Sequence, residues 1–589
     1  MTMIKLNDKQ VDYLNSPLFQ NTYLRACPGS GKTEIISYKF AQEMKRWSHF
    51  PAGIGILSFS RSATTELVDR IADVRKGNRQ SYPHFIGTVD SFILKNIVTP
   101  MAHVITKFNG RDGDYSIRVV DEHAVIHQCT KYAYAGINFP ANRFDWDTAT
   151  GRYIFQHSSD GLRRKLNLLV LNDWQIADLN NAKRKFYESG FATYRDVELL
   201  ALQIFKENQF HDRIGQIAAR YPVIVVDECQ DLSAEQIAIF SHLSERGVCF
   251  HMVGDLNQAI YGFRNCVPDN VIAFIEELQC NEIQLDENHR SGQAIVDIQQ
   301  KIINSGKITG RANYSDKTCY LVEYKVCPSE ALGIFAELAN GHKRSVIVAR
   351  GHSTLARLNF NTAGASPVET LARSIMAFSQ TKDASFRDSL GLFASYLAQN
   401  CILTETRGED AQFRPFEMES AEEWHRFLFN CLDRLVDQGL GNTALTWADW
   451  CRVLKKVLVN IPIDTATPLC IQQALTEFKR KKHASPPTMG ANPIGISLVT
   501  NLSHQPHRLA TIHEVKGETH DVTMLVSSIR KGHGAHWKDW MEDVTTEAAR
   551  FAYVGSSRPR HILIWAVKAL NKKERAQLME IGFHENLIC

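Results

Sequence analysis

The sequence predicts an α/β protein built on parallel β-sheets, and two observations lead to this fold class. The stretch NTYLRAC has the character of a short buried strand; a glycine-rich turn and the helically spaced TEIISYKFAQEMKRW follow it. A second, almost wholly apolar stretch runs from Tyr221 to Val226, as expected of a central parallel strand. The chain of 589 residues is too long for one hydrophobic core, so about four domains are expected.

The turn after the first strand, ACPGSGKT, has the composition of a phosphate-binding loop. Gly29 and Gly31 let backbone N–H groups close around phosphates at a helix N-terminus, which already favours anions. Lys32 adds a charge for the β- and γ-phosphates, and the Thr33 hydroxyl can ligate Mg²⁺. Ala26 departs from the usual pattern, which has glycine there. The expected triphosphate contacts are Ala26, Cys27, Pro28, Gly29, Ser30, Gly31, Lys32 and Thr33.

Two carboxylates, Asp227 and Glu228, follow the second apolar strand. A carboxylate at this position can hold the Mg²⁺ of a bound nucleotide, and its neighbour can orient or deprotonate the attacking water. We therefore assign Asp227 to the metal, together with Thr33, and Glu228 to the water. The alternative, a simple acidic turn, fits one carboxylate better than an Asp-Glu pair in a chain with a phosphate loop. The sequence predicts an enzyme that hydrolyses a nucleoside triphosphate.

The motifs ACPGSGKT and VVDECQD resemble those of superfamily 1A helicases of the UvrD/Rep/PcrA type, and further motifs follow in that family's order. The set runs from Leu6 to Leu563. The resemblance implies an α/β fold of two RecA-like parallel-sheet motor domains, of the P-loop NTPase class, each with a mainly helical insertion. The implied boundaries are motor domain 1A at 1–95 and 205–279, insertion 1B at 96–204, motor domain 2A at 280–358 and 495–589, and a 2B-like insertion at 359–494.

The same resemblance assigns nucleotide contacts. LNDKQVDYL implies Gln10 as the adenine contact, while LDENHRSG and SSRPRHIL place Arg290 and Arg558 as fingers on the γ-phosphate. In TIHEVKGETHD, Gly517 and Glu518 stand near the nucleotide sugar. The order Glu-Thr replaces the common Leu-Glu, so Glu518 either reaches the ribose from a shifted register or that contact is lost. The implied catalytic set is Lys32, Asp227, Glu228, Gln258, Arg290 and Arg558.

DNA contacts are implied by three further motifs, ILSFSRSATTELVDRI, FIGTVDSFI and VGDLNQAIYGFRN, and by TIHEVKG. Phe263, beside Tyr261 and Arg264, could offer a stacking face for an unpaired base. For each aromatic residue, Phe59 above all, the alternative is packing in the core. The implied DNA contacts are Phe59, Ser60, Arg61, Thr88, Tyr261, Phe263, Arg264 and His513.

Arg290 and Arg558 lie far from Lys32 in the sequence, so a second folded lobe is expected to supply them. Phosphoryl transfer depends mostly on positioning and charge stabilisation, so ATP would close the cleft between lobes and hydrolysis would let it reopen. The expected function is an ATP-dependent DNA helicase or translocase moving 3′ to 5′. ATP and Mg²⁺ are the implied cofactors, and single-stranded DNA and single-strand/duplex junctions the implied partners.

The insertions leave alternatives open. The basic clusters Arg163-Arg164-Lys165 and Lys183-Arg184-Lys185 are expected on a solvated helix face, and duplex phosphates are the second interpretation. The second insertion is short for a 2B domain and offers a docking surface for a protein partner such as a nuclease. With this compact insertion, the chain weakly resembles helicase-like subunits of anti-phage systems such as Gabija. The alternative function is thus a DNA-activated ATPase subunit of a repair or defence complex with little unwinding of its own.

Composition and the N-terminal sequence indicate the cellular compartment in which the protein is expected. The N-terminal MTMIKLNDKQ carries charges where a signal peptide has an apolar run, and no stretch approaches the ~20 apolar residues of a membrane helix. The thirteen cysteines lack zinc-site spacing, so a reduced compartment is expected. A cytoplasmic enzyme without a membrane partner fits these features. A fused C-terminal nuclease is not expected, because the chain stops soon after Arg558 and no D…E-x-K cluster stands out.

Overall fold

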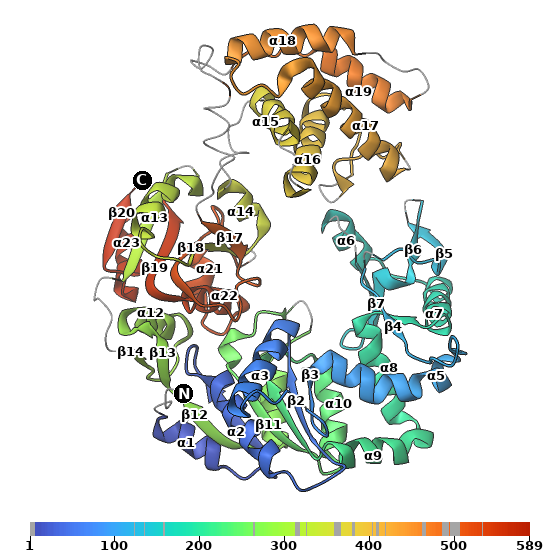
Figure 1. Ribbon diagram of the computed structural model, residues 1–589, viewed down its shortest axis with the longest axis vertical. Coiled ribbons are helices and arrows are strands. Elements are labelled where there is room, and N and C mark those ends of the chain that lie inside the picture. Colours follow the sequence, from blue (N-terminus) through green and yellow to red (C-terminus); the bar gives the residue numbers. More distant parts are fainter. Residues whose placement is uncertain are drawn as a thin grey trace.

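The computed structural model shows two α/β lobes, each extended by an insertion (Figure 1). It describes residues 6–588 except 80, 123, 135, 157–159, 263–264, 312–317, 326, 359–366, 380–382, 403, 408–410, 419, 462–466, 486–493, 495–506 and 533. In this part of the chain, no helix has the length and apolar content needed to cross a membrane.

The first lobe is built on a six-stranded parallel sheet with the order β12-β1-β11-β10-β2-β3. The apolar run after Tyr221 forms its buried strand β10, whose alternate residues enter different cores: Val223 and Val225 face one side, and Ile224 and Val226 the other. Helices therefore cover both faces. The strands are β1 (Thr22–Ala26), β2 (Ile54–Ser58), β3 (Phe85–Thr88), β10 (Val223–Asp227), β11 (Cys249–Gly254) and β12 (Asn281–Leu285); the main helices are α1 (Asp8–Asn15), α2 (Lys32–Arg46), α3 (Arg61–Val74), α10 (Ala234–Ser244) and α11 (Pro268–Glu277).

The first sheet extends past the boundary predicted at residue 279. Strand β12 pairs in parallel with β1 over five residues, so it closes the edge of the first sheet. From Glu282 on, its exposed and buried residues alternate, as in an edge strand with one solvated face, and this pattern does not reveal which sheet the strand joins. The boundary between the lobes therefore follows Leu285.

The second lobe carries another six-stranded parallel sheet, ordered β17-β16-β18-β19-β15-β20. Two parallel sheets confirm the predicted α/β class and are consistent with two RecA-like domains. The strands are β15 (Cys319–Tyr324), β16 (Ser345–Ala349), β17 (Arg508–Thr511), β18 (His520–Val526), β19 (Pro559–Lys568) and β20 (Glu585–Ile588). A two-stranded sheet and two central helices pack beside them: β13 (Glu287–Gly292), β14 (Thr309–Arg311), α12 (Gln293–Ile303) and α22 (Glu547–Ser556).

The first insertion is less helical than predicted. Besides its helices it contains three two-stranded sheets, which the sequence pattern missed because strands of two to six residues are too short to show a clear alternation. The helices are α5 (Thr99–Thr106), α6 (Asp160–Asn167), α7 (Asp173–Glu188) and α8 (Tyr194–Lys206); the strands are β4 (Arg118–Val119), β5 (Cys129–Tyr134), β6 (Ile137–Pro140), β7 (Phe144–Asp147), β8 (Arg152–Phe155) and β9 (Phe191–Ala192).

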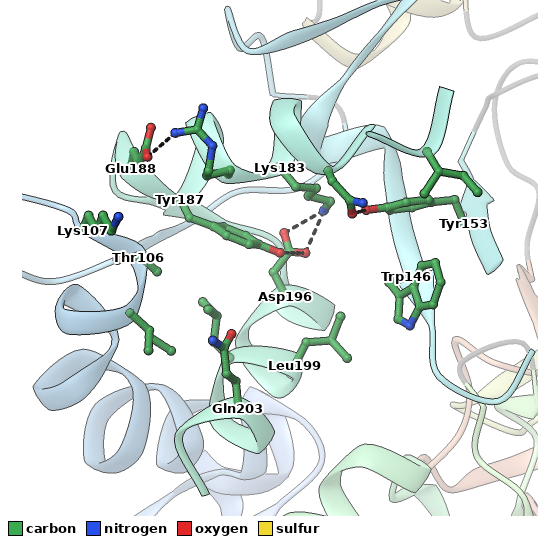
Figure 2. Close-up of a pocket in the computed structure, with 15 residues that line it drawn as sticks. Thr106, Lys107, Trp146, Tyr153, Lys183, Tyr187, Glu188, Asp196, Leu199 and Gln203 are labelled. Carbon is green, nitrogen blue, oxygen red and sulfur yellow. Dashed lines mark hydrogen bonds and ion pairs between the residues drawn. The ribbon is translucent and has the colours of Figure 1, made fainter. Parts of the chain in front are cut away.

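One of the two basic clusters in this insertion is not a solvated face throughout. Lys183 is buried, and its ammonium donates to both Asp145 and Asp196. The Tyr187 hydroxyl donates to the same Asp196 carboxylate, beside a cavity of about 550 Å³ between α5, α7 and α8 (Figure 2). The two aspartates were not recognised as partners because they lie 38 and 13 residues away along the chain. Lys183 is a core cation of the insertion, whereas Arg184 beside it is exposed.

The second insertion is a separate helical unit above the second lobe (Figure 1). A single core cluster drawn from residues 368–494 holds it together, with Trp424, Trp447 and Trp450 fully buried. Its helices are α15 (Pro367–Ser379), α16 (Asp383–Asn400), α17 (Ala421–Leu435), α18 (Trp447–Asn460) and α19 (Leu469–Arg480).

Candidate nucleotide and DNA site

The phosphate-binding loop joins β1 to α2 and requires glycine at two positions. Gly29 and Gly31 have φ values of +74° and +79°, in the left-handed region that other residues avoid. A Cβ atom on Gly29 would also lie 2.6 Å from the Arg290 Cβ and from the Asn288 Oδ1. The loop backbone therefore approaches the second lobe as closely as its atoms allow.

A cavity of about 570 Å³ lies where this loop meets the second lobe. It brings together most of the predicted nucleotide residues, although they are spread over more than 500 positions of the chain. Ala26 and Glu518 do not line it: Ala26 is the buried last residue of β1. The predicted residues that do line it are Gln10, Cys27, Pro28, Gly29, Ser30, Gly31, Lys32, Thr33, Asp227, Glu228, Gln258, Arg290, Gly517 and Arg558.

Lys32 and the two carboxylates form the charged floor of the cavity. The Lys32 Nζ lies 2.6 Å from the Glu228 Oε1. Burial alone would lower the pKa of Lys32, but the charges of Glu228 and Asp227 raise it overall. The pKa of Glu228 is lowered in spite of burial, because Lys32 is so close, while burial and the Glu228 charge raise the pKa of Asp227. Glu228 is thus held ionised, and Asp227 is the carboxylate that would gain most from a bound cation.

Two arginines from the second lobe face this floor. The Arg558 side chain is 1% exposed; its Nη2 donates to the Gln258 Oε1 at 2.9 Å, so it is fixed across the lobe boundary. The Arg290 Nη1 donates to the Ser557 carbonyl oxygen at 2.9 Å. Burial lowers the pKa of Arg290 to about 9, with the Arg558 charge adding to the effect, and burial lowers the pKa of Arg558 to about 10. Two partly desolvated cations in one cavity favour an anionic ligand.

Of the two residues predicted to contact the base and the sugar of the nucleotide, Gln10 lines the cavity and Glu518 does not. Gln10 lies in α1, where its Nε2 donates to the Ser30 carbonyl oxygen at 3.1 Å. The Glu518 carboxylate is turned toward Arg508, whose Nη1 lies 2.7 Å from its Oε2, and toward His520. Thr519, the next residue, lines the cavity instead. The structure thus holds the Glu518 side chain away from the nucleotide cavity.

A second group of predicted residues gathers between the lobes. The rings of Phe59 and Tyr261 stack with their centroids 5.0 Å apart, and the His513 ring lies 5.7 Å from Tyr261. Lys516 places its ammonium 4.8 Å from the centre of the Tyr261 ring. Phe59 and Tyr261 come from the first lobe and His513 and Lys516 from the second. Phe263 and Arg264 lie outside the described residues.

Ser60, Arg61 and Thr88 lie at the carboxyl ends of β2 and β3, on the same edge of the sheet as the phosphate loop. The Ser60 hydroxyl accepts a hydrogen bond from the Ala63 N–H and caps α3. The Thr88 hydroxyl accepts one from the Ser91 N–H and caps the short helix α4 (Val89–Phe92). Arg61 is exposed at the first position of α3. This edge carries helix N-termini that favour phosphate groups.

Comparison with known proteins agrees with this arrangement. Residues 6–279 match the sequence family described as the UvrD/REP helicase N-terminal domain. This first part of the chain is similar to the UvrD/REP helicase family. It is 24% identical to the ATP-dependent DNA helicase PcrA of Leuconostoc citreum over 51% of this chain and 39% of that protein, and 25% identical to DNA helicase II of Haemophilus influenzae over 53% and 41%. It is also 24% identical to DNA helicase II of Escherichia coli, over 53% of this chain and 42% of that protein.

The chain thus spans about two fifths of the length of these relatives. The structure also shows residues of the site that the sequence motifs did not assign. Lys516 donates to both oxygens of Asp231 at 2.6 Å, across the lobe boundary. The sequence feature that could have identified Lys516 as a site residue is its position in the VKG motif. Other unassigned residues line the nucleotide cavity: Glu34, Ala63, Glu66, Arg70, His289, Arg311, Thr519 and Arg560.

A hydrogen-bonded chain connects the charged floor to the second lobe. The Gln230 Nε2 donates to the Glu228 Oε2 at 2.6 Å, and the Asp255 N–H donates to the Gln230 Oε1 at 3.1 Å. Asp255 then accepts from Gln258 and, across the boundary, from the Tyr553 hydroxyl at 3.0 Å. Because such buried groups are costly to leave unpaired, a change at Glu228 can reach the second lobe through this chain.

Proposed function

We propose that the protein is a motor that hydrolyses ATP and moves 3′ to 5′ along single-stranded DNA, separating duplexes ahead of it. The observation that carries the proposal is one cavity in which Lys32 and Glu228 of the first lobe face Arg290 and Arg558 of the second. The polarity and the DNA substrate are taken from the UvrD/REP family. The stacked aromatic residues between the lobes support a single-strand contact, because every base offers a π-face.

The residues of the cavity account for phosphoryl transfer. The triphosphate would lie along the loop, and its negative charge would draw Lys32 away from Glu228, leaving that carboxylate to orient the attacking water. Arg290 and Arg558 would stabilise the charge that develops on the γ-phosphoryl oxygens. The Ser30 hydroxyl is buried and has no hydrogen-bond partner among the described residues, as expected of a donor kept for a phosphate oxygen.

The donor set also fits Mg²⁺. The Thr33 hydroxyl and the Asp227 carboxylate line the same cavity, and the described residues contain no cluster of three or more potential metal ligands. Mg²⁺ usually takes one or two protein oxygens and completes its shell with phosphates and water. When held by Thr33 and Asp227, the ion would offset the negative charge of the triphosphate. Asp227 would then be ionised, with the cation offsetting the burial that raises its pKa.

The link between hydrolysis and DNA runs through one short segment. Gln258, which accepts from Arg558, is three residues before Tyr261, which stacks on Phe59. The His513 Nε2 lies 3.1 Å from the Ile260 carbonyl oxygen, in the same segment. A movement of Arg558 on γ-phosphate release would therefore shift the segment that holds the aromatic stack.

The proposal is tested by ATP hydrolysis with and without single-stranded DNA. We expect DNA to stimulate the rate and Lys32→Ala to abolish it, because the substitution removes the cation for the β- and γ-phosphates. Lys45→Ala is the matched control, since Lys45 lies on the same helix but is exposed. A full rate without DNA, or hydrolysis by Lys32→Ala, would contradict the proposal.

Strand separation distinguishes a helicase from a DNA-activated ATPase subunit. Duplexes with a 3′ or a 5′ single-stranded tail are offered in separate reactions with ATP. A 3′-to-5′ helicase separates the 3′-tailed duplex. Hydrolysis without separation of either duplex would favour an ATPase subunit that needs a partner.

A further inference from the structure

The helix that carries Gln10, α1, is attached to the phosphate loop at its start. The Gln10 Nε2 donates to the Ser30 carbonyl oxygen, and its Oε1 accepts from the Asn7 N–H at 3.1 Å in the capping box of α1. The Gln10 side chain is 5% exposed and lines the nucleotide cavity. Its position therefore depends on how firmly the eight residues of α1 are held.

The end of α1 is held by a buried lysine. The Lys39 ammonium donates to the Ser16 carbonyl oxygen at 2.7 Å and to the Leu14 carbonyl oxygen at 3.2 Å. The last carbonyl groups of a helix have no partner within it, and a cation there also interacts favourably with the helix dipole. Lys39 is 1% exposed, and burial lowers its pKa to about 8. A lysine so fully buried is retained at a desolvation cost.

His251 of β11 extends this attachment. Its ring is fully buried, and its Nε2 lies 3.0 Å from the carbonyl oxygen of Leu18, so this nitrogen donates. The His251 ring packs against the edge of Tyr13 of α1, with centroids 6.1 Å apart. The Lys39 ammonium lies 5.3 Å from the centre of the same Tyr13 ring. Lys39, Tyr13 and His251 are thus one buried group between α1, α2 and β11.

Lys39 and Lys32 lie on one rigid helix, seven residues or about two turns apart. The helix that begins at the phosphates therefore also fixes α1. We propose that Lys39 and His251 are positioning residues that hold Gln10 against the phosphate loop and thereby set the affinity and base selectivity of the nucleotide site. This inference rests on the proposed nucleotide function with Gln10 as the base contact.

The test is a double-mutant cycle on ATP against GTP. Lys39→Met removes the donors to α1, and we expect the KM for ATP to rise about tenfold, as for the loss of a charge-assisted hydrogen bond. The ratio of ATP to GTP kcat/KM should fall by a similar factor, with kcat for ATP within about twofold of wild type. In a Gln10→Ala background, Lys39→Met should cause no further loss of selectivity, because the two residues act through one contact.

Lys45→Met is the matched control: Lys45 also reaches from α2 to a backbone carbonyl, that of Val74, but at an exposed site away from α1. Amide hydrogen exchange should speed up in α1 of Lys39→Met and not in α3. Lys39→Arg, which keeps donors, should retain the selectivity. If Lys39→Met does not fold, Lys39→Gln is measured in the same cycle.

Unchanged selectivity in Lys39→Met, or in Lys39→Gln where that variant replaces it, or additive losses in the double variant, would overturn the inference. In either case Lys32→Ala would still abolish hydrolysis, so the proposed function would stand. Hydrolysis by Lys32→Ala would instead remove the proposed function itself.

Discussion

At the scale of single residues, Arg558 is a buried cation whose side chain is fixed by hydrogen bonds. Its Nε donates to the Val554 carbonyl oxygen at 2.9 Å, and its Nη2 donates to the Ser557 hydroxyl and to Gln258. These contacts fix the plane of the guanidinium before any phosphate arrives. A pre-oriented charge costs no reorganisation when the transition state forms.

We expect Arg558→Lys to lower kcat for ATP by about 10³-fold, because an ammonium cannot make the same directed contacts. The rate of hydrolysis at saturating ATP and DNA measures this. Arg452→Lys, at an exposed position of α18 outside the motor lobes, is the control. A loss of less than tenfold would mean that Arg558 has only a structural role.

Residues within short motifs could be placed from the sequence, because the loop and its helix fix them locally. Lys32, Glu228 and both arginines do line one cavity. Glu518 could not be placed in this way. Its side chain direction depends on Arg508, ten residues earlier in β17, and no local pattern encodes that pairing.

At the scale of elements, α8 connects the first insertion to the first lobe. Arg195 of α8 donates to Asp147 of the β7–β8 hairpin and to Glu235 of α10, and Thr148 of the hairpin donates to the same Glu235. Glu198, one turn later, lies near this group. Burial raises the pKa of Glu198 to about 8, and the charges of Asp90 and Glu235 add to the effect.

This raised pKa predicts a pH dependence of stability. Between about pH 4.5 and 8 the folded protein keeps a proton on Glu198 that the unfolded chain releases, so the contribution to the free energy of unfolding falls as pH rises through that range. Glu198→Gln cannot ionise. We expect it to melt near the wild-type temperature at pH 5 and above it at pH 8.5 in thermal denaturation. Glu276→Gln, on the exposed face of α11, should melt at the wild-type temperature at both pH values.

The helices of the insertion could be predicted from their apolar spacing, but its short strands could not. In β7 the sequence Phe-Asp-Trp-Asp places carboxylates where a strand normally buries apolar groups. Asp145 is tolerated there because Lys183 of α7 meets it, a contact between elements that hydrophobic patterning does not report.

At the scale of the whole molecule, the lobes are joined by ion pairs and hydrogen bonds. Lys516 meets Asp231, the Arg550 Nε donates to the Ala259 carbonyl oxygen at 2.7 Å, and Glu547 accepts from the Gly262 N–H. Asp231 is 2% exposed, and burial raises its pKa to about 6 even with Lys516 beside it.

Lys516→Met should destabilise the contact between the lobes by about 3 kcal/mol, because it leaves the buried Asp231 carboxylate without its cation. We expect a lower melting temperature and weaker stimulation of ATP hydrolysis by DNA. The double variant Lys516→Met/Asp231→Asn should recover much of the melting temperature but not the stimulation. Equal stimulation in wild type and Lys516→Met would show that this pair does not couple the lobes.

The way the chain passes from β12 to β13 restricts how the two lobes can move relative to each other. Leu285 ends the first sheet, Glu287 begins the strand beside the second, and Asp286 alone lies between them. The two Cα–Cα steps from Leu285 to Glu287 span at most ~7 Å, so the lobes cannot separate freely at this point. The lobes can rotate relative to each other about Asp286. Under the proposed function, advance along a polynucleotide would come from rotation around this pivot, with the largest displacement at the rim farthest from Asp286.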